Sequence, residues 1–177
     1  MNDWEHGKRE IEREHLGLFL DAHEAATGES FLEMIDSETP DFIGRDVLGR
    51  VVGIEITQLR FGPDEQHIRR ISPPEPADHH AWWRLLDLMH RKNQTLTKGR
   101  WPKCERKILV IILIDTSLEA VTAGTDTDTP SEGGFSEVWL ADYTQVEAFG
   151  AVDLFAVVHP ELEGHFATGD RGQKPFG

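Results

Sequence analysis

A chain of 177 residues with 38% apolar and 28% charged residues is long enough for one globular domain and too polar to lie within a bilayer. Its net charge of −14 opposes non-specific attraction to a polyanion, which depends on Lys and Arg. A single cysteine, Cys104, excludes an internal disulfide and a cysteine-rich zinc site. We expect one cytoplasmic domain over 1–177, with its core over about 9–160, a flexible tail over 161–177 and no membrane contact.

The amino-terminal third of the chain predicts a helix, a strand and a hairpin. Apolar residues at helical spacing predict a helix over 9–27, and Gly28 follows as a stop signal. A short strand is expected at 31–36. Two antiparallel strands are then expected at 41–46 and 50–59. The predicted buried stripe of the helix consists of Ile11, Leu18, Ala22 and Ala25.

The rest of the chain alternates predicted loops with helix and strand patterns. A proline-rich and charged loop is expected at 60–80, and a second helix at 81–97. The most apolar segment, 108–115, is typical of a central buried strand. The remaining expected segments are a loop at 116–134, strands at 135–143 and 152–159, and a short helix or turn at 144–149. This order predicts an α/β fold in layers.

The predicted hairpin carries two carboxylates. Alternate residues of a strand face opposite sides, so Glu55 and Thr57 share one face while Ile54 and Ile56 share the other. Asp41 begins the partner strand, so the hairpin can bring both carboxylates to the same end of the sheet. Two ionised carboxylates repel each other, and Mg²⁺ or Mn²⁺ would offset that repulsion. The competing interpretation is that Glu55 faces solvent on an edge strand.

Both predicted helices carry charged residues toward the sheet. Glu14 falls on the predicted buried stripe of the first helix, while Glu10 and Glu12 project toward its flanks. On the second helix Lys92 lies toward the packed side, and Lys98 points nearly opposite. Either Glu14 or Lys92 could instead lay its stem on apolar surface and keep its charge in water.

Together these features resemble the PD-(D/E)XK, or restriction-endonuclease-like, nuclease superfamily. "TPDF" precedes "GIEITQ", with a Glu-bearing helix before them and a Lys-bearing helix after them, over roughly 9–115. The resemblance implies a restriction-endonuclease-like core with a mixed β-sheet flanked by helices. It also implies metal-dependent hydrolysis of phosphodiester bonds in DNA, or less favourably in RNA. Asp41 and Glu55 then match the Mg²⁺ (or Mn²⁺) ligands, and Glu14 matches the helix Glu.

The sequence departs from this pattern at one position. Thr57 stands where the superfamily has its motif lysine. Some members supply the lysine from the following helix, where Lys92 is placed to do so and Lys98 is the other candidate; Gln58 is an accessory polar group. Nucleic acid is the implied partner, and a homodimer is left open. Two alternatives remain: a catalytically inactive binding module with the nuclease fold, or an unrelated α/β domain in which Asp41 lies far from its supposed partner.

Other charged and aromatic groups carry weaker signals. Asp78, in "DHH", is more simply the cap of the second helix than a metal ligand. The basic stretches at 67–70 and 100–107 could contact phosphates or could be ordinary solvated faces. Of the paired tryptophans, Trp83 could stack on a base, whereas Trp82 is expected in the core.

Overall fold

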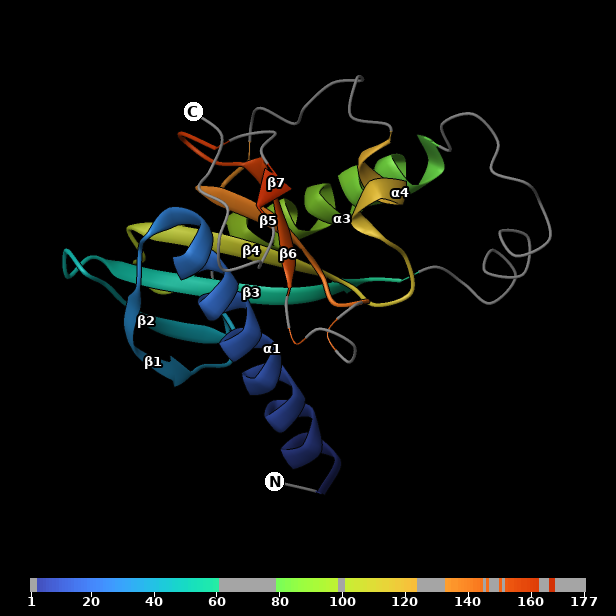
Figure 1. The fold of residues 1–177 in the computed structure, drawn as a ribbon. Helices are drawn as coiled ribbons and strands as arrows, with labels where there is room; N and C mark the ends of the chain where they lie inside the picture. The colour runs from blue at the N-terminus through green and yellow to red at the C-terminus, as the bar shows by residue number, and fades with distance from the viewer. Residues whose placement is uncertain are drawn as a thin grey trace.

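The structure is a computed structural model that describes residues 3–60, 79–98, 101–123, 133–144, 146, 150, 152–162 and 166–167. Most of the predicted loop at 60–80 and of the predicted turn at 144–149 lies outside these residues. The elements are helices α1 (Asp3–Thr27), α3 (His79–Thr97) and α4 (Leu118–Thr122), with strands β1 (Phe31–Asp36), β2 (Phe42–Asp46), β3 (Val51–Leu59), β4 (Arg106–Leu113), β5 (Glu137–Asp142), β6 (Asp153–Val158) and β7 (Phe166–Ala167) (Figure 1).

The strands form one seven-stranded mixed sheet in chain order, from β1 at one edge to β7 at the other. β4 runs parallel to both β3 and β5, and all other neighbouring pairs are antiparallel. Helix α1 packs on one face of the sheet, and α3 and α4 pack on the other (Figure 1). The predicted α/β class, with a mixed sheet flanked by helices, is therefore confirmed.

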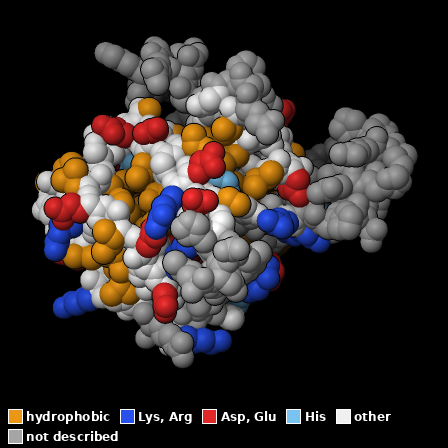
Figure 2. Space-filling model, turned by 90° about the horizontal axis from the view of Figure 1, so that it is seen from below, with side chains coloured by type: hydrophobic (Ala, Val, Ile, Leu, Met, Phe, Trp, Pro, Cys, Tyr) orange, Lys and Arg blue, Asp and Glu red, His pale blue; other side chains and the backbone are white. Residues whose placement is uncertain are grey.

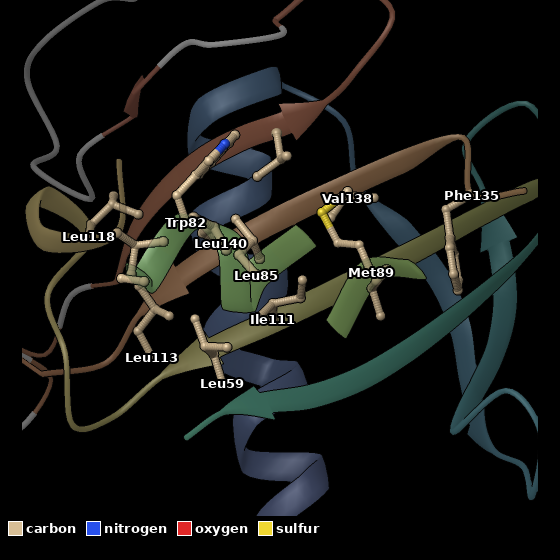
Figure 3. Close-up of a cluster of buried hydrophobic side chains, with 14 of the residues drawn as sticks. Leu59, Trp82, Leu85, Met89, Ile111, Leu113, Leu118, Phe135, Val138 and Leu140 are labelled. Carbon is tan, nitrogen blue, oxygen red and sulfur yellow. The ribbon is translucent and has the colours of Figure 1, made fainter. Parts of the chain in front are cut away.

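The core lies on both faces of β4. Every residue from Ile108 to Leu113 is fully buried, as the prediction of a central buried strand requires. The even-numbered residues of this run join the cluster under α1, and the odd-numbered ones join the cluster under α3. In the α3 cluster, Leu85 and Met89 meet Ile111 and Leu140 of the sheet (Figure 3).

The buried face of α1 differs from the predicted stripe. Leu16, Phe19 and His23 are the buried residues, at 6%, 0% and 0% exposure. Ile11 is 52% exposed, and Ala25 is exposed as well, so the predicted stripe is wrong at both its ends. The physical reason is His23, whose buried polar ring bonds to a carboxylate of the sheet. A search for apolar periodicity does not count histidine as a buried residue. The predicted stripe therefore lies on a different side of the helix from the stripe that is buried.

Two short elements lie in segments for which the sequence predicts no regular structure. Helix α4 interrupts the predicted loop at 116–134, and the Ser117 hydroxyl caps it by accepting a hydrogen bond from the backbone N–H of Ala120 at 3.2 Å. Strand β7 lies in the predicted tail at 161–177, where it pairs with β6. No helix within the described part of the chain has the length and apolar character needed to cross a bilayer.

A buried guanidinium joins three strands at one end of the sheet. Arg106, at the start of β4, donates from Nε to Glu137 Oε1 of β5 at 3.0 Å. Its Nη1 reaches Glu29 Oε2 at 2.9 Å and Asp46 Oδ2 of β2 at 3.5 Å, and its Nη2 also donates to Glu137 Oε1. Its charge is thereby shared among three carboxylates, of which only Glu29 is substantially exposed.

The second oxygen of Glu137 completes this network. Oε2 accepts from Trp139 Nε1 at 3.0 Å and lies 3.4 Å from His23 Nε2 of α1. Burial works to raise the pKa of Glu137, but the hydrogen bonds from His23 and Arg106 outweigh it and lower the pKa to about 2. Glu137 therefore stays ionised, and the network links α1 to the sheet.

Replacing Arg106 by Met should lower the free energy of unfolding by about 3–5 kcal/mol at pH 7, because Glu137 would remain as a buried charge without its main partner. Urea denaturation measures this loss. The double variant Arg106→Met/Glu137→Gln should lose less than the sum of the two single variants. Simple additivity would show that the two side chains do not depend on each other.

Candidate functional site

The register of the β2–β3 hairpin brings two carboxylates together. Phe42 and Ile54 are Cα partners, so Asp41, one residue earlier, stands opposite Glu55, one residue later. Residues directly opposite in an antiparallel pair point to the same face, here the face covered by α3. The backbone N–H of Ile56 donates to Asp41 Oδ2 at 2.8 Å and fixes this carboxylate beside β3. The structure thus brings the two predicted ligands together.

Helix α3 adds a lysine to this pair. Lys92 Nζ lies 2.8 Å from Glu55 Oε1, and the two side chains are 26% and 18% exposed. The helix is held in this orientation by its buried face, which packs on the sheet through Leu85, Met89 and Leu96. Lys98 is exposed. Of the two lysines weighed from the sequence, Lys92 is therefore the one that the fold brings to the carboxylates.

The electrostatic cost of this arrangement falls on Asp41. Burial and the charge of Glu55 raise its pKa to about 6, and the charge of Glu12 adds to the rise. The hydrogen bond from Ile56 and the charge of Lys92 act in the opposite direction without overcoming them. Asp41 thus changes protonation near neutral pH, which is typical of a carboxylate placed for binding or chemistry rather than for structure.

The acidic residue of α1 whose charge acts on Asp41 is Glu12, not Glu14. Glu14 is exposed, so its predicted place on the buried stripe is wrong. The Glu12 side chain is only 15% exposed, and its charge acts on Asp41. It forms salt bridges with Lys8 at 3.2 Å and Arg9 at 3.5 Å. A stripe that included Leu16 would have identified Glu12, because Glu12 lies four residues before the buried Leu16 and so on the same side of the helix.

The two predicted accessory residues lie on different faces of the sheet. Thr57 alternates with Glu55 and lies on the α3 face, where it is partly buried. Gln58 pairs in register with Ile112, which belongs to the cluster under α1, so Gln58 faces away from the carboxylates. Its Oε1 accepts from Arg60 Nε at 2.7 Å instead. Of the two, only Thr57 is placed to contribute to the site.

The donor set suits a hard divalent cation that keeps most of its water. Asp41 and Glu55 offer carboxylate oxygens, and Mg²⁺ commonly binds through one or two carboxylates together with water and phosphate oxygens. Within the described residues, no group of three or more His, Cys, Asp or Glu side chains is placed to hold a metal ion. Asp78 and the basic stretch at 67–70 lie outside the described residues. Two carboxylates alone do not supply the full set of protein ligands that a structural zinc site needs.

Comparisons of the chain with family models, with curated proteins and with solved structures gave no match.

Replacing Asp41 by Asn should stabilise the metal-free protein by about 1–2 kcal/mol at pH 8, a figure reduced from the full pKa shift because the side chain is partly exposed. A raised pKa means that ionising Asp41 costs folding free energy. That cost is absent below the unfolded pKa near 4 and complete above about pH 6, so the advantage of Asn should vanish at pH 4. Urea denaturation in EDTA at both pH values measures it.

The matched control for this measurement is Asp87→Asn, because the Asp87 side chain is 66% exposed on α3. It should change stability by less than about 0.5 kcal/mol at either pH. An Asp41→Asn variant less stable than the wild type at pH 8 would contradict the electrostatic account.

Two neighbouring glutamates of α1 give a second test. Glu12→Gln should lower the pKa of Asp41, because it removes a negative charge that raises that pKa. Glu14→Gln should leave it unchanged, since Glu14 is exposed and is not among the charges that shift Asp41. NMR titration of the Asp41 carboxyl carbon measures both. Equal effects of the two substitutions would contradict the selective action of the Glu12 charge on Asp41.

Proposed function

We propose that the chain is a metal-dependent nuclease of the restriction-endonuclease-like type that hydrolyses phosphodiester bonds in DNA or RNA. The observation that carries this proposal is the convergence of Asp41, Glu55 and Lys92 on one face of the sheet. Two carboxylates and a lysine from a following helix match what the sequence resemblance implies. The mixed sheet between helices is compatible with such a core.

Each residue of the group has a separate role in this proposal. Asp41 and Glu55 would hold Mg²⁺ or Mn²⁺, which when bound supplies Lewis-acid polarisation of a phosphate and offsets negative charge. Lys92 would orient the attacking water or stabilise the negative charge that develops on the phosphate oxygens. Its ammonium is already held beside Glu55, so it needs little reorganisation to act there.

The pKa of Asp41 links this function to pH. A carboxylate must be ionised to bind a cation, so a pKa of about 6 makes metal binding weaker below that pH. Binding near pH 6 should therefore release a proton from the site. Glu12 supports the same role indirectly, because its negative charge adds to the attraction for a cation at this position.

An inactive binding module with the same fold is the second candidate, and Thr57 favours it. The motif lysine is missing from its position in the strand, and Lys92 is tied to a carboxylate. The net charge of −14 also disfavours a nucleic-acid partner. On the face shown in Figure 2, basic side chains are interspersed with acidic ones rather than gathered into one broad basic surface. Binding of a nucleic acid would therefore depend on a few local contacts.

Cleavage assays on plasmid and single-stranded substrates with Mg²⁺ or Mn²⁺ test the proposal. Glu55→Ala should reduce the rate at least about 100-fold, and Lys92→Met should do so to a similar extent. Lys98→Met is the matched control, since it removes the same charge from an exposed position of the same segment, and it should stay within about twofold of the wild type.

Two outcomes would overturn the proposal. Cleavage that Glu55→Ala leaves unchanged would exclude the site. Calorimetry that detects no binding of Mg²⁺ or Mn²⁺ at millimolar concentration would instead favour the inactive module.

A further inference from the structure

An indole ring lies over Gly53 of β3, and the glycine makes room for it. Gly53 is two residues before Glu55 and so belongs to the same face of β3. A Cβ atom on Gly53 would lie 2.8 Å from Trp101 Cζ3, 2.9 Å from Pro40 Cγ and 3.0 Å from Cys104 Sγ. Any side chain at position 53 would therefore displace this cluster. The close approach of the ring to the strand depends on the glycine.

This cluster includes the residue that precedes the first carboxylate. Pro40 is the residue before Asp41, and both its ring and that of Trp101 lie close to Gly53. The ring of Trp101 packs edge-to-face against Phe135, with 5.6 Å between the ring centroids. Trp101 is held on that side by the core yet stays partly exposed. The structure thus presents part of an aromatic ring over Gly53, on the face of β3 that also carries Glu55.

A lysine completes the surroundings of this ring. Lys107 of β4 is the Cα partner of Gly53 in the parallel ladder, so it points to the same face of the sheet. It is partly buried, and its positive charge acts on the thiol of Cys104. None of the described residues forms a salt bridge with Lys107.

We propose that Trp101 and Lys107 form a nucleotide subsite next to Asp41 and Glu55, in which the indole stacks on a base and the ammonium binds a phosphate of the same strand. This inference rests on the proposed function, whose reacting phosphate would lie at the carboxylates. It names single-stranded nucleic acid as the substrate, because a base can stack on a side chain only when it has left its own helix stack. Sequence preference is not required, since every base has an aromatic face.

The subsite also explains how a chain of net charge −14 could bind a polyanion. A broad basic surface would attract any polyanion, whereas stacking on one ring is independent of charge. One ring and one lysine would then select an unpaired nucleotide beside the carboxylates. The basic stretch at 100–107 would take part through Lys107, while its exposed member Lys103 would remain a solvated surface group.

Fluorescence anisotropy of two labelled oligonucleotides in EDTA tests the subsite. One is an eight-nucleotide thymidine strand and the other is an abasic strand with the same phosphates. The wild type should bind the thymidine strand about tenfold more tightly. Trp101→Leu should bring this ratio close to one, and Trp101→Phe should retain most of it. Lys107→Gln should weaken binding of both strands by a similar factor of about three. A uridine strand run in parallel distinguishes RNA from DNA as the source of the nucleotide.

The controls are chosen from the same protein. Trp83→Leu removes an indole that is 55% exposed on α3, and it should leave the ratio unchanged. Lys103→Gln removes an exposed lysine near the subsite, and it should leave the affinity for both strands unchanged. A wild-type ratio of one, a ratio that survives Trp101→Leu, or an equal loss in Trp83→Leu would overturn the proposal. Thermal melting of each variant verifies folding.

A measurement on the unaltered protein covers the case in which Trp101→Leu does not fold. Cys104 is the only cysteine in the sequence, and its Sγ lies close to Gly53, as Trp101 does. Its reaction with a thiol reagent therefore reports on the subsite. The thymidine strand should slow that reaction at least about fivefold, and the abasic strand should not. Equal rates with both strands would overturn the proposal.

The proposed function and the subsite fail in distinguishable ways. Preference for the thymidine strand without cleavage under any metal condition would reject the nuclease and keep the subsite. If the protein cleaves nucleic acid but shows no preference for the thymidine strand, the nuclease is kept and the subsite is rejected. The same conclusion follows if Trp101→Leu leaves that preference unchanged. Asp41→Asn should lose cleavage yet retain the base preference.

Discussion

The buried guanidinium of Arg106 is the interaction on which the arrangement of this sheet depends. It joins β4 to β2 and β5, and through Glu137 and His23 it also anchors α1. A buried charge is tolerated only when its partners are in place, so these strands cannot shift relative to one another without a large loss of free energy. The register that the network preserves is the same register that sets Asp41 opposite its partner carboxylate on the other face.

The candidate site holds two carboxylates close together, and their mutual repulsion and partial burial destabilise the folded protein. Asp41 and Glu55 stand together on a partly buried face, and only one of them is paired with the ammonium of Lys92. The remaining cost appears in the raised pKa of Asp41. A divalent cation would remove it, since its charge would attract both carboxylates and release the lysine for another partner. The features that destabilise the metal-free protein are thus those that would bind a metal.

The proposed metal site and the proposed subsite would use one strand in two ways. β3 contributes Glu55 at one position and, two residues before it, a glycine over which Trp101 can lie. Both positions face α3, so a nucleic-acid strand that reached the carboxylates would also pass the ring. Parallel pairing adds Lys107 from β4 beside the glycine. The active face would then depend on local groups, consistent with a chain that is acidic as a whole.

The alternation of the β2–β3 hairpin, the buried character of β4 and the inward direction of Lys92 could all be predicted from the sequence, because each follows from the period of a single element. The choice of Glu12 over Glu14 could not. It depends on the rotation of α1 about its axis, which is set by a buried histidine that meets a carboxylate of a distant strand. Likewise, only strand register places Lys107 beside Gly53, and only tertiary packing brings Trp101 to the same glycine. The sequence by itself determined which residues share a face of their own element, whereas the tertiary structure decided which faces meet, because that outcome depends on contacts between segments far apart in the chain.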